Sequence, residues 1–235
     1  MKTVVLACET IAAEVMKAAG ETKTTFPIFW VESGLHNTPE RLKKQLQSDL
    51  DRIDNVDYIL LLLGYCGNAI LNLVSRKSKL VIPKVDDCIS MLLGGNEKRN
   101  ALNKEAMAYY LTEGWLQHDN NLWAEYQHCL KKYGPERTRR LYQIMLGRYK
   151  NLNVIDTGAY DLRAFLPLSS LIAAELNLTH QVVKGTLSII KKALLGQWDE
   201  DFAIIECGEP VTLLNMGLGN NYAAPDQLQM GNLGF

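Results

Sequence analysis

Short apolar segments alternate with helical segments through roughly the first hundred residues, and this alternation constrains the fold more than any other feature of the chain. The apolar segments run from Thr3 to Ala7, Phe26 to Val31, Tyr58 to Leu63 and Leu80 to Ile82. The helical segments run from Glu9 to Ala19, Pro39 to Ile53, Asn68 to Ser75 and Asp86 to Leu93. Such alternation predicts a parallel sheet whose strands are joined by crossover helices.

The remainder of the chain extends this pattern less regularly. Further strands are expected at Met107 to Leu111, Leu152 to Ile155 and Phe202 to Ile205, and helices at Leu122 to Lys132, Glu136 to Tyr149, Leu168 to Leu176 and Gln181 to Leu195. We therefore predict one α/β domain over residues 1–214, with a mainly parallel, Rossmann-like sheet of about seven strands in flavodoxin-like order and helices on both faces. Residues 215–235, rich in Gly and Asn, are expected to form a tail outside that domain.

The charge balance argues against polyanionic partners. The 235 residues include 22% charged residues and give a formal net charge of −1, so no nucleic-acid or acidic membrane partner is expected. The apolar segments are too short to cross a membrane, and the first is too short for a signal peptide. We therefore expect a cytoplasmic protein whose five cysteines are reduced, with a homodimer as the default oligomer.

Three cysteines follow three different predicted strands. Cys8 follows the first strand, Cys66 the third and Cys88 the fourth, while His36 follows the second. Loops at the carboxyl ends of parallel strands share one edge of the sheet, where ligands bind. The three thiols can meet there only if the strand order is 2-1-3-4, since the order 3-2-1-4 separates strands three and four.

The sequence around these cysteines suggests a ligand site. Gly64 and Gly67 flank Cys66 and would let the backbone turn and approach a ligand, and Asn68 is suited to capping a helix. A thiol at the start of a helix is expected to have a lowered pKa. Thiolates together with His36 suit zinc first, with an iron–sulfur centre or corrinoid cobalt as alternatives, and Asp86 or Asp87 could add oxygen ligands.

Other readings of these cysteines stay open. A free cysteine is commonly buried as a small apolar residue, and a single cysteine could instead serve as a nucleophile. Cys207 also follows a predicted strand and is a weaker candidate. Cys129 lies within a predicted helix and is expected to be structural, and His118 and His180 lie among polar residues and are expected to be exposed.

Two later strand ends carry residues that could complete a pocket. Thr112, Glu113 and Trp115 follow the fifth predicted strand, and Asp156 follows the sixth. We expect Glu113, or alternatively Asp156, to act as the acid or base, and Thr112, Trp115 and Asp156 to contact a bound cofactor or substrate. The alternative for each polar residue is a capping or turn role.

Several of these motifs, in this order, resemble the family catalogued as domain of unknown function 1638. The matching segments are Ala7-Cys8-Glu9, Gly34 to Pro39, Gly64 to Asn68, Ile82-Pro83, Asp87-Cys88-Ile89, Tyr109 to Thr112, Gly114-Trp115 and Ile155 to Gly158. Members of the family are often encoded beside corrinoid-dependent methyltransferases, which implies a role near methyl metabolism. The resemblance implies a ligand role for Cys8, His36, Cys66 and Cys88. Cys207 and Asp86 lie outside the family pattern.

Together, these features predict a metal-binding protein with a three-cysteine site, acting in or beside corrinoid-dependent methyl transfer with a small molecule or a corrinoid protein as partner. Two alternatives stay open. One is a metal-free module that binds a small molecule or cofactor, and the other is an enzyme with a cysteine nucleophile and Glu113 as its acid or base. Whether the protein catalyses a reaction is left open.

Overall fold

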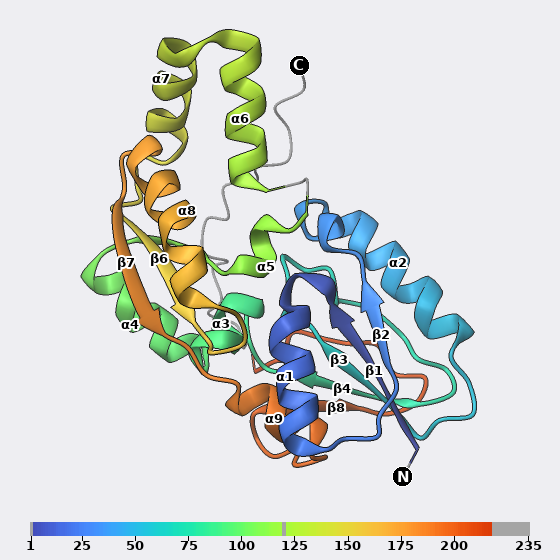
Figure 1. Cartoon of the computed structure of the whole chain (residues 1–235). Helices are drawn as coiled ribbons and strands as arrows, with labels where there is room; N and C mark the ends of the chain where they lie inside the picture. The colour runs from blue at the N-terminus through green and yellow to red at the C-terminus, as the bar shows by residue number, and fades with distance from the viewer. Residues whose placement is uncertain (1, 119–120, 218–235) are drawn as a thin grey trace.

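The first sheet has the strand order that the cysteine argument requires. The computed structural model describes residues 2–118 and 121–217, apart from the side chains of residues 36 and 37. The strands of this sheet are β1 (Thr3–Cys8), β2 (Ile28–Val31), β3 (Tyr58–Leu62), β4 (Lys79–Pro83) and β8 (Phe202–Ile205). They lie in the order β2-β1-β3-β4-β8, and the first four are parallel (Figure 1).

A second, smaller sheet contains the other strands of the described chain. Its members are β5 (Ala108–Leu111), β6 (Asn151–Asp156) and β7 (Thr179–Lys184), all parallel and in the order β5-β6-β7. The prediction of a single sheet of about seven strands is therefore wrong. The reason is that β8 pairs antiparallel with β4, with Leu80 opposite Ile205, so β4 has no free edge left for β5.

Eleven helical elements connect and cover the strands in the described ranges. Seven of the helices are α1 (Ala12–Thr22), α2 (Pro39–Arg52), α3 (Cys88–Leu93), α4 (Asn96–Glu105), α5 (Glu113–Leu116), α6 (Leu122–Tyr133) and α7 (Pro135–Met145). The others are α8 (Leu162–Glu175), α9 (Ser188–Leu194) and the 3-10 helices η1 (Glu9–Ile11) and η2 (Ser33–Asn37). In Figure 1, α6 and α7 form a hairpin that extends away from the first sheet, and α1 packs against α9.

Two local predictions fail for identifiable reasons. The segment predicted as a helix from Asn68 to Ser75 instead forms turns, and Asn68 and Asn72 have φ of 76° and 60°, a left-handed conformation that asparagine tolerates. The start of the helix predicted from Gln181 is instead strand β7, in which Val182 and Val183 pair with β6. Valine favours strands, and pairing with β6 overrides the helical pattern further along.

The apolar side chains form two clusters that match the two sheets. The larger surrounds the first sheet, where every residue of β1 is buried, and the smaller lies between the second sheet and helices α6, α7 and α8. Continuous apolar strands such as β3 are typical of parallel strands covered on both faces. Trp115 of α5 packs against both clusters, so α5 lies where the two sheets meet.

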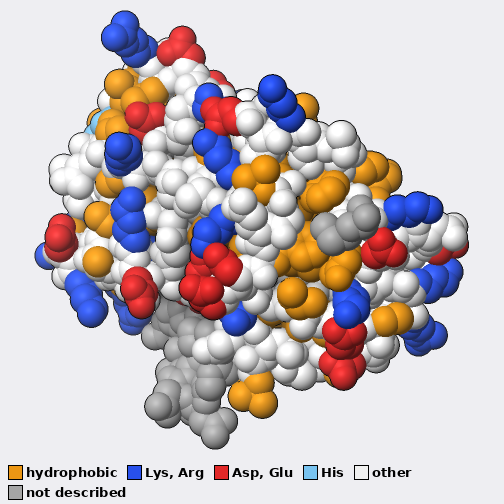
Figure 2. All heavy atoms as spheres, turned by 90° about the horizontal axis from the view of Figure 1, so that it is seen from below, with side chains coloured by type: hydrophobic (Ala, Val, Ile, Leu, Met, Phe, Trp, Pro, Cys, Tyr) orange, Lys and Arg blue, Asp and Glu red, His pale blue; other side chains and the backbone are white. Residues whose placement is uncertain are grey.

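The face that lies at the bottom of Figure 1 carries hydrophobic, acidic and basic side chains (Figure 2). Figure 2 shows hydrophobic side chains gathered on this face, bordered by acidic and basic side chains. Among the side chains described on this face, no block of a single charge sign stands out (Figure 2). No helix in the described ranges has the length and apolar character needed to span a membrane.

The junction between the sheets depends on a close approach at Gly114. A Cβ atom placed on Gly114 would lie within van der Waals overlap of the Thr10 carbonyl oxygen, at 2.2 Å. Only a residue without a side chain allows α5 to pack this closely on η1, because the obstructing atom belongs to the backbone.

We predict that Gly114→Ala lowers the free energy of unfolding by about 1–3 kcal/mol, because the added methyl group forces α5 away from η1. Urea denaturation monitored by circular dichroism measures the change. The matched control is Gly20→Ala in α1, where an added Cβ meets no atom within 4 Å and the change should be neutral or stabilising. Equal stability of the two variants would contradict the prediction.

Candidate functional site

The carboxyl ends of strands from both sheets meet at the junction around α5. Figure 1 shows α5 between the two sheets, beside the start of α1, and α5 contacts η1 directly. From the second sheet, the Thr157 hydroxyl, just after β6, donates a hydrogen bond of 3.0 Å to Glu14 Oε1 of α1. Ligands bind at the carboxyl ends of parallel strands, so this junction is the candidate functional site.

The three cysteines predicted as ligands approach this edge from three neighbouring strands. Cys8 is the last residue of β1, Cys66 lies in the loop after β3, and Cys88 is the first residue of α3, after β4. A charge on Cys8 raises the pKa of both Cys66 and Cys88, and a charge on Cys66 raises the pKa of Cys88. The fold therefore gathers the three thiols into one neighbourhood.

The prediction that these thiols have lowered pKa values is wrong for the structure described here. Burial is the main cause that raises the pKa of Cys8, Cys66 and Cys88, and their mutual repulsion adds to the rise for Cys66 and Cys88. Only Cys88 begins an α-helix, which is six residues long. Desolvation therefore outweighs any stabilisation by helix ends, and the thiols are protonated near neutral pH.

Hydrogen bonds fix the position of Cys8 but leave it neutral. Its thiol donates to Thr10 Oγ1 at 3.3 Å, and the Thr10 and Ser33 hydroxyls lie 2.8 Å apart. Thr10 and Ser33 are both buried and connect the end of β1 to η2, the element that carries His36. The side chain of His36 lies outside the described part of the structure.

The loop that carries Cys66 is held tightly against the loop after β4. A Cβ on Gly64 would lie 2.4 Å from the Asp87 Cα, and the Cys66 amide donates to the Asp86 carbonyl oxygen at 2.8 Å. Cys66, Gly67 and Asn68 follow one another in the left-handed region, with φ of 47°, 62° and 76°. The absence of a side chain at Gly64 thus allows the two loops to pack closely.

Asn68 does not cap a helix, because no helix follows it. Non-glycine residues in the left-handed region are uncommon and occur often at functional sites.

The two aspartates suggested as oxygen ligands have structural partners. Asp87 caps α3, with Oδ1 accepting from the Ser90 amide at 2.9 Å, and its Oδ2 pairs with Arg99 at 2.5 Å. Asp86 Oδ1 accepts from the Asn96 side chain at 3.2 Å. The spacing of Asp87 and Ser90 is that of an N-cap, a local signal that sequence reading could have used. The part played by Arg99 depends on α4, which was not predicted.

The residues predicted after the later strands divide between the site and local structure. Thr112 is fully buried at the N-cap position of α5, yet its hydroxyl makes no capping bond, and in the described structure it has no hydrogen-bond partner. Glu113 begins α5 and is half-buried, and Trp115 lies on the same short helix. Asp156 accepts a hydrogen bond from the Gly158 amide at 3.1 Å, so the turn role considered for it is observed.

Glu14 is a residue of the junction that sequence reading missed. It is 1% exposed, although it is an acidic residue on α1. Its position among Ile11, Val15 and Ala18 places it on the buried face of the helix, a pattern that could have drawn attention to it. Its contacts with the second sheet could not have been read from that pattern.

The other cysteines and histidines lie apart from this cluster. Cys129 packs in the smaller hydrophobic cluster, as expected of a structural residue, and Cys207 is exposed, with its thiol 2.8 Å from the Arg76 carbonyl oxygen. His180, predicted to be exposed, is half-buried and lies 2.9 Å from the Ser169 hydroxyl. His118, also predicted to be exposed, is half-buried and lies 3.9 Å from Glu9, near the junction.

The thiol cluster is not arranged as a metal site in the described structure. Among the residues whose side chains are described, no group of three or more His, Cys, Asp or Glu side chains is placed to hold a metal ion. The thiols are near enough to affect each other's pKa but do not surround a common point.

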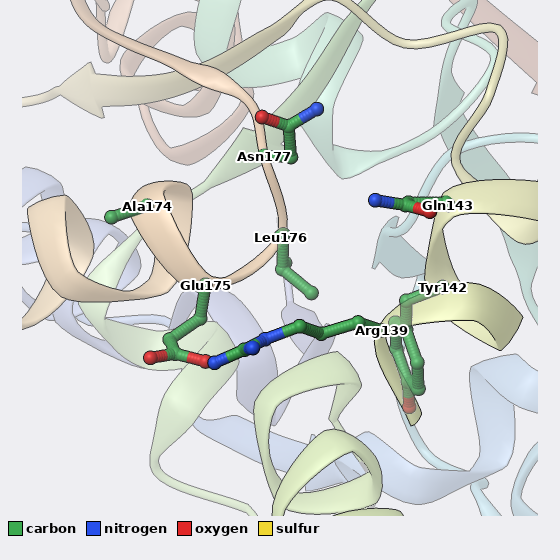
Figure 3. Close-up of a pocket in the computed structure, with 7 residues that line it drawn as sticks. All are labelled: Arg139, Tyr142, Gln143, Ala174, Glu175, Leu176 and Asn177. Atoms are coloured by element: carbon green, nitrogen blue, oxygen red, sulfur yellow. The ribbon is translucent and has the colours of Figure 1, made fainter. Parts of the chain in front are cut away.

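One cavity of about 300 Å³ lies away from the thiols, between α7 and the end of α8. Figure 3 shows the guanidinium group of Arg139 directed toward Glu175 across this cavity. The Tyr126 hydroxyl donates to Glu175 Oε2 at 2.8 Å, so that carboxylate already has a partner. The cavity contains none of the predicted site residues; its lining is Arg139, Tyr142, Gln143, Ala174, Glu175, Leu176 and Asn177.

A comparison of the sequence with models of known families gives a match. A family model described as "Protein of unknown function (DUF1638)" matches residues 30–194, more than half of the chain. The chain belongs to this family. The matched segment of this DUF1638 protein includes Cys66, Cys88 and α5, and Cys8 precedes it. No curated protein and no solved structure matches the chain.

The raised pKa values predict slow alkylation of the clustered thiols. At about pH 7.5, iodoacetamide should modify the exposed Cys207 at least about tenfold faster than Cys66 or Cys88, because only the thiolate reacts and each unit of pKa reduces its fraction tenfold. Mass spectrometry of peptides from a time course measures the rates. A clustered cysteine that reacts faster than Cys207 would show that it is a nucleophile instead.

Proposed function

We propose that this DUF1638 protein binds a thiophilic metal ion, zinc in the first place, through Cys8, Cys66 and Cys88. The observation that supports the proposal is that three strand ends gather three thiols, and that charge on Cys8 raises the pKa of both Cys66 and Cys88. A buried cluster of thiolates is unfavourable by itself, and a cation compensates it by replacing the protons. Soft sulfur ligands select zinc, iron–sulfur clusters and related metals over hard cations such as magnesium.

The proposal requires the thiols to move. Zinc–sulfur bonds are about 2.3 Å long, and the described side chains do not surround a common point. The proposal therefore includes a change of rotamer at Cys66 and Cys88 that brings their sulfur atoms and that of Cys8 around one ion. His36 on the neighbouring η2 is the proposed fourth ligand, as the sequence suggested.

We further propose that the site acts in or beside corrinoid-dependent methyl transfer, with a small molecule or a corrinoid protein as its partner. A thiolate-bound metal supplies Lewis acidity, which can activate a thiol or bind a methyl donor. The short helix α5 presents Glu113 as a proton carrier beside the fully buried Thr112, and Trp115 forms an apolar wall. Iron–sulfur and corrinoid cobalt are the alternative occupants.

A metal-free binding module is the second candidate. The Thr112 hydroxyl is buried without a partner in the described structure, and a ligand with a polar group at the junction would satisfy it. A cysteine nucleophile fits less well, because burial keeps the pKa of each clustered thiol above its ordinary value. Retention of an organic ligand that survives substitution of each cysteine would favour the binding module.

We predict that anaerobically purified protein holds close to one metal ion per chain, and that Cys66→Ser or Cys88→Ser weakens zinc binding at least about tenfold, because each removes one thiolate ligand. Elemental analysis and chelator competition measure content and affinity. The matched control is Cys129→Ser, which changes a thiol in the other hydrophobic cluster and should leave binding unchanged. Wild-type protein that binds no zinc, iron or cobalt would rule the proposal out.

Zinc affinity should also increase with pH. The thiols are protonated below their raised pKa values and must release protons to bind the ion, so between about pH 6 and about pH 8 the affinity rises by up to about three decades per pH unit. Titration calorimetry in buffers of different ionisation enthalpy counts the released protons. Cys88→Ser should reduce that number by about one, whereas an affinity independent of pH would contradict thiolate ligation.

A further inference from the structure

Glu14 is a buried carboxyl that the proposed metal site does not use. It lies on α1 and is 1% exposed. Its Oε1 accepts the 3.0 Å hydrogen bond from the Thr157 hydroxyl, and its Oε2 is buried without a hydrogen-bond partner in the described structure. A buried polar atom without a partner is rare in native proteins and calls for an explanation.

The charged groups around Glu14 are mainly acidic. The charge of Glu113, on α5, raises the pKa of Glu14. The charges of Glu14, Glu113 and Asp156 together raise the pKa of the Tyr160 hydroxyl. Lys191 of α9 reaches α1, but its ammonium group pairs with Glu21, two turns beyond Glu14. Among the described residues, Glu14 makes no ion pair with a basic side chain.

This environment favours the neutral carboxylic acid. Burial is the main cause that raises the pKa of Glu14 above its ordinary value, and the charge of Glu113 adds to the rise, whereas the bond from Thr157 opposes it. Because the folded-state pKa is raised, the associated stability is present below the unfolded pKa of a glutamate and is lost as pH rises through the folded pKa. An ionised Glu14 would place an unpaired charge in a dry contact between the sheets.

The contact at Glu14 connects the two halves of the site. Thr157 follows β6 of the second sheet, and Gly114 of α5 packs on Thr10, four residues before Glu14. Thr10 lies in η1, which leads directly into α1, so one short continuous segment makes both contacts. Separation of the sheets at Glu14 would therefore also move α5 away from Cys8 and its partner Thr10.

We propose that Glu14 is a positioning residue that keeps the second sheet closed over α1 only while its carboxyl carries a proton. Ionisation strengthens the bond from Thr157, but the larger cost of burying the charge favours separation of the sheets, so that α5, with Thr112 and Glu113, moves away from the thiol cluster. The proposal rests on the proposed function only for its consequence at the metal site. The contact between the sheets can be measured without metal, so failure of one proposal is distinguishable from failure of the other.

The test follows Trp115, which packs against both hydrophobic clusters and reports on the junction. The full chain is labelled with fluorotryptophan, its ¹⁹F resonance is assigned with Trp115→Phe, and spectra are recorded with and without zinc from about pH 5 to about pH 9. The Trp115 resonance of the wild type should shift in a single titration. In Glu14→Gln, which mimics the neutral acid, it should keep its low-pH position throughout.

A matched control and a second measurement complete the test. Glu21→Gln changes an exposed glutamate on the same helix, and the Trp115 titration should persist in it. Infrared spectra of the wild type should show a protonated carboxyl near neutral pH, a result that does not depend on the folding of any variant. The proposal is overturned if that band is absent, if Trp115 does not titrate in the wild type, or if Glu14→Gln titrates like the wild type.

Discussion

The antiparallel pairing of β8 with β4 determines the architecture on which the site depends. A parallel sheet can grow by adding strands at its edge, but β8 returns from the end of the described chain and occupies that edge. Strands β5, β6 and β7 do not join this sheet but pair with one another, which gives the separate sheet β5-β6-β7. Two sets of strand ends consequently face one junction, and α5 packs between them through the close approach of Gly114 to Thr10.

Burial, rather than helix ends, controls the chemistry of this junction. The thiols of Cys8, Cys66 and Cys88 and the carboxyl of Glu14 all have pKa values raised mainly by desolvation. The three thiols are therefore uncharged near neutral pH, and burial favours the neutral form of Glu14 more than that of an exposed glutamate. A cation at the thiols would reverse this balance for the cysteines, whereas Glu14 has no basic partner among the described residues.

The accuracy of the sequence predictions differs between the two halves of the chain. Strands β1 to β4 were predicted correctly because continuous apolar runs separated by helical segments indicate parallel strands, and their 2-1-3-4 order is the one that a shared three-cysteine site requires. Strand β7 was missed, since its exposed residues show no apolar run, and helix α4 was missed because none of its residues is buried. The helix predicted after Cys66 was wrong because left-handed residues at Asn68 and Asn72 favour turns.

The sequence by itself determined the α/β class, the family, and the placement of Cys8, Cys66 and Cys88 at the ends of three different strands. These features follow from local hydrophobic patterns and from the rule that parallel strands end at one edge. Only the tertiary structure decided that the strands divide into two sheets, that the thiols are neutral, and that Glu14 contacts Thr157. Burial and contacts between distant residues decide these properties, and no local pattern encodes them.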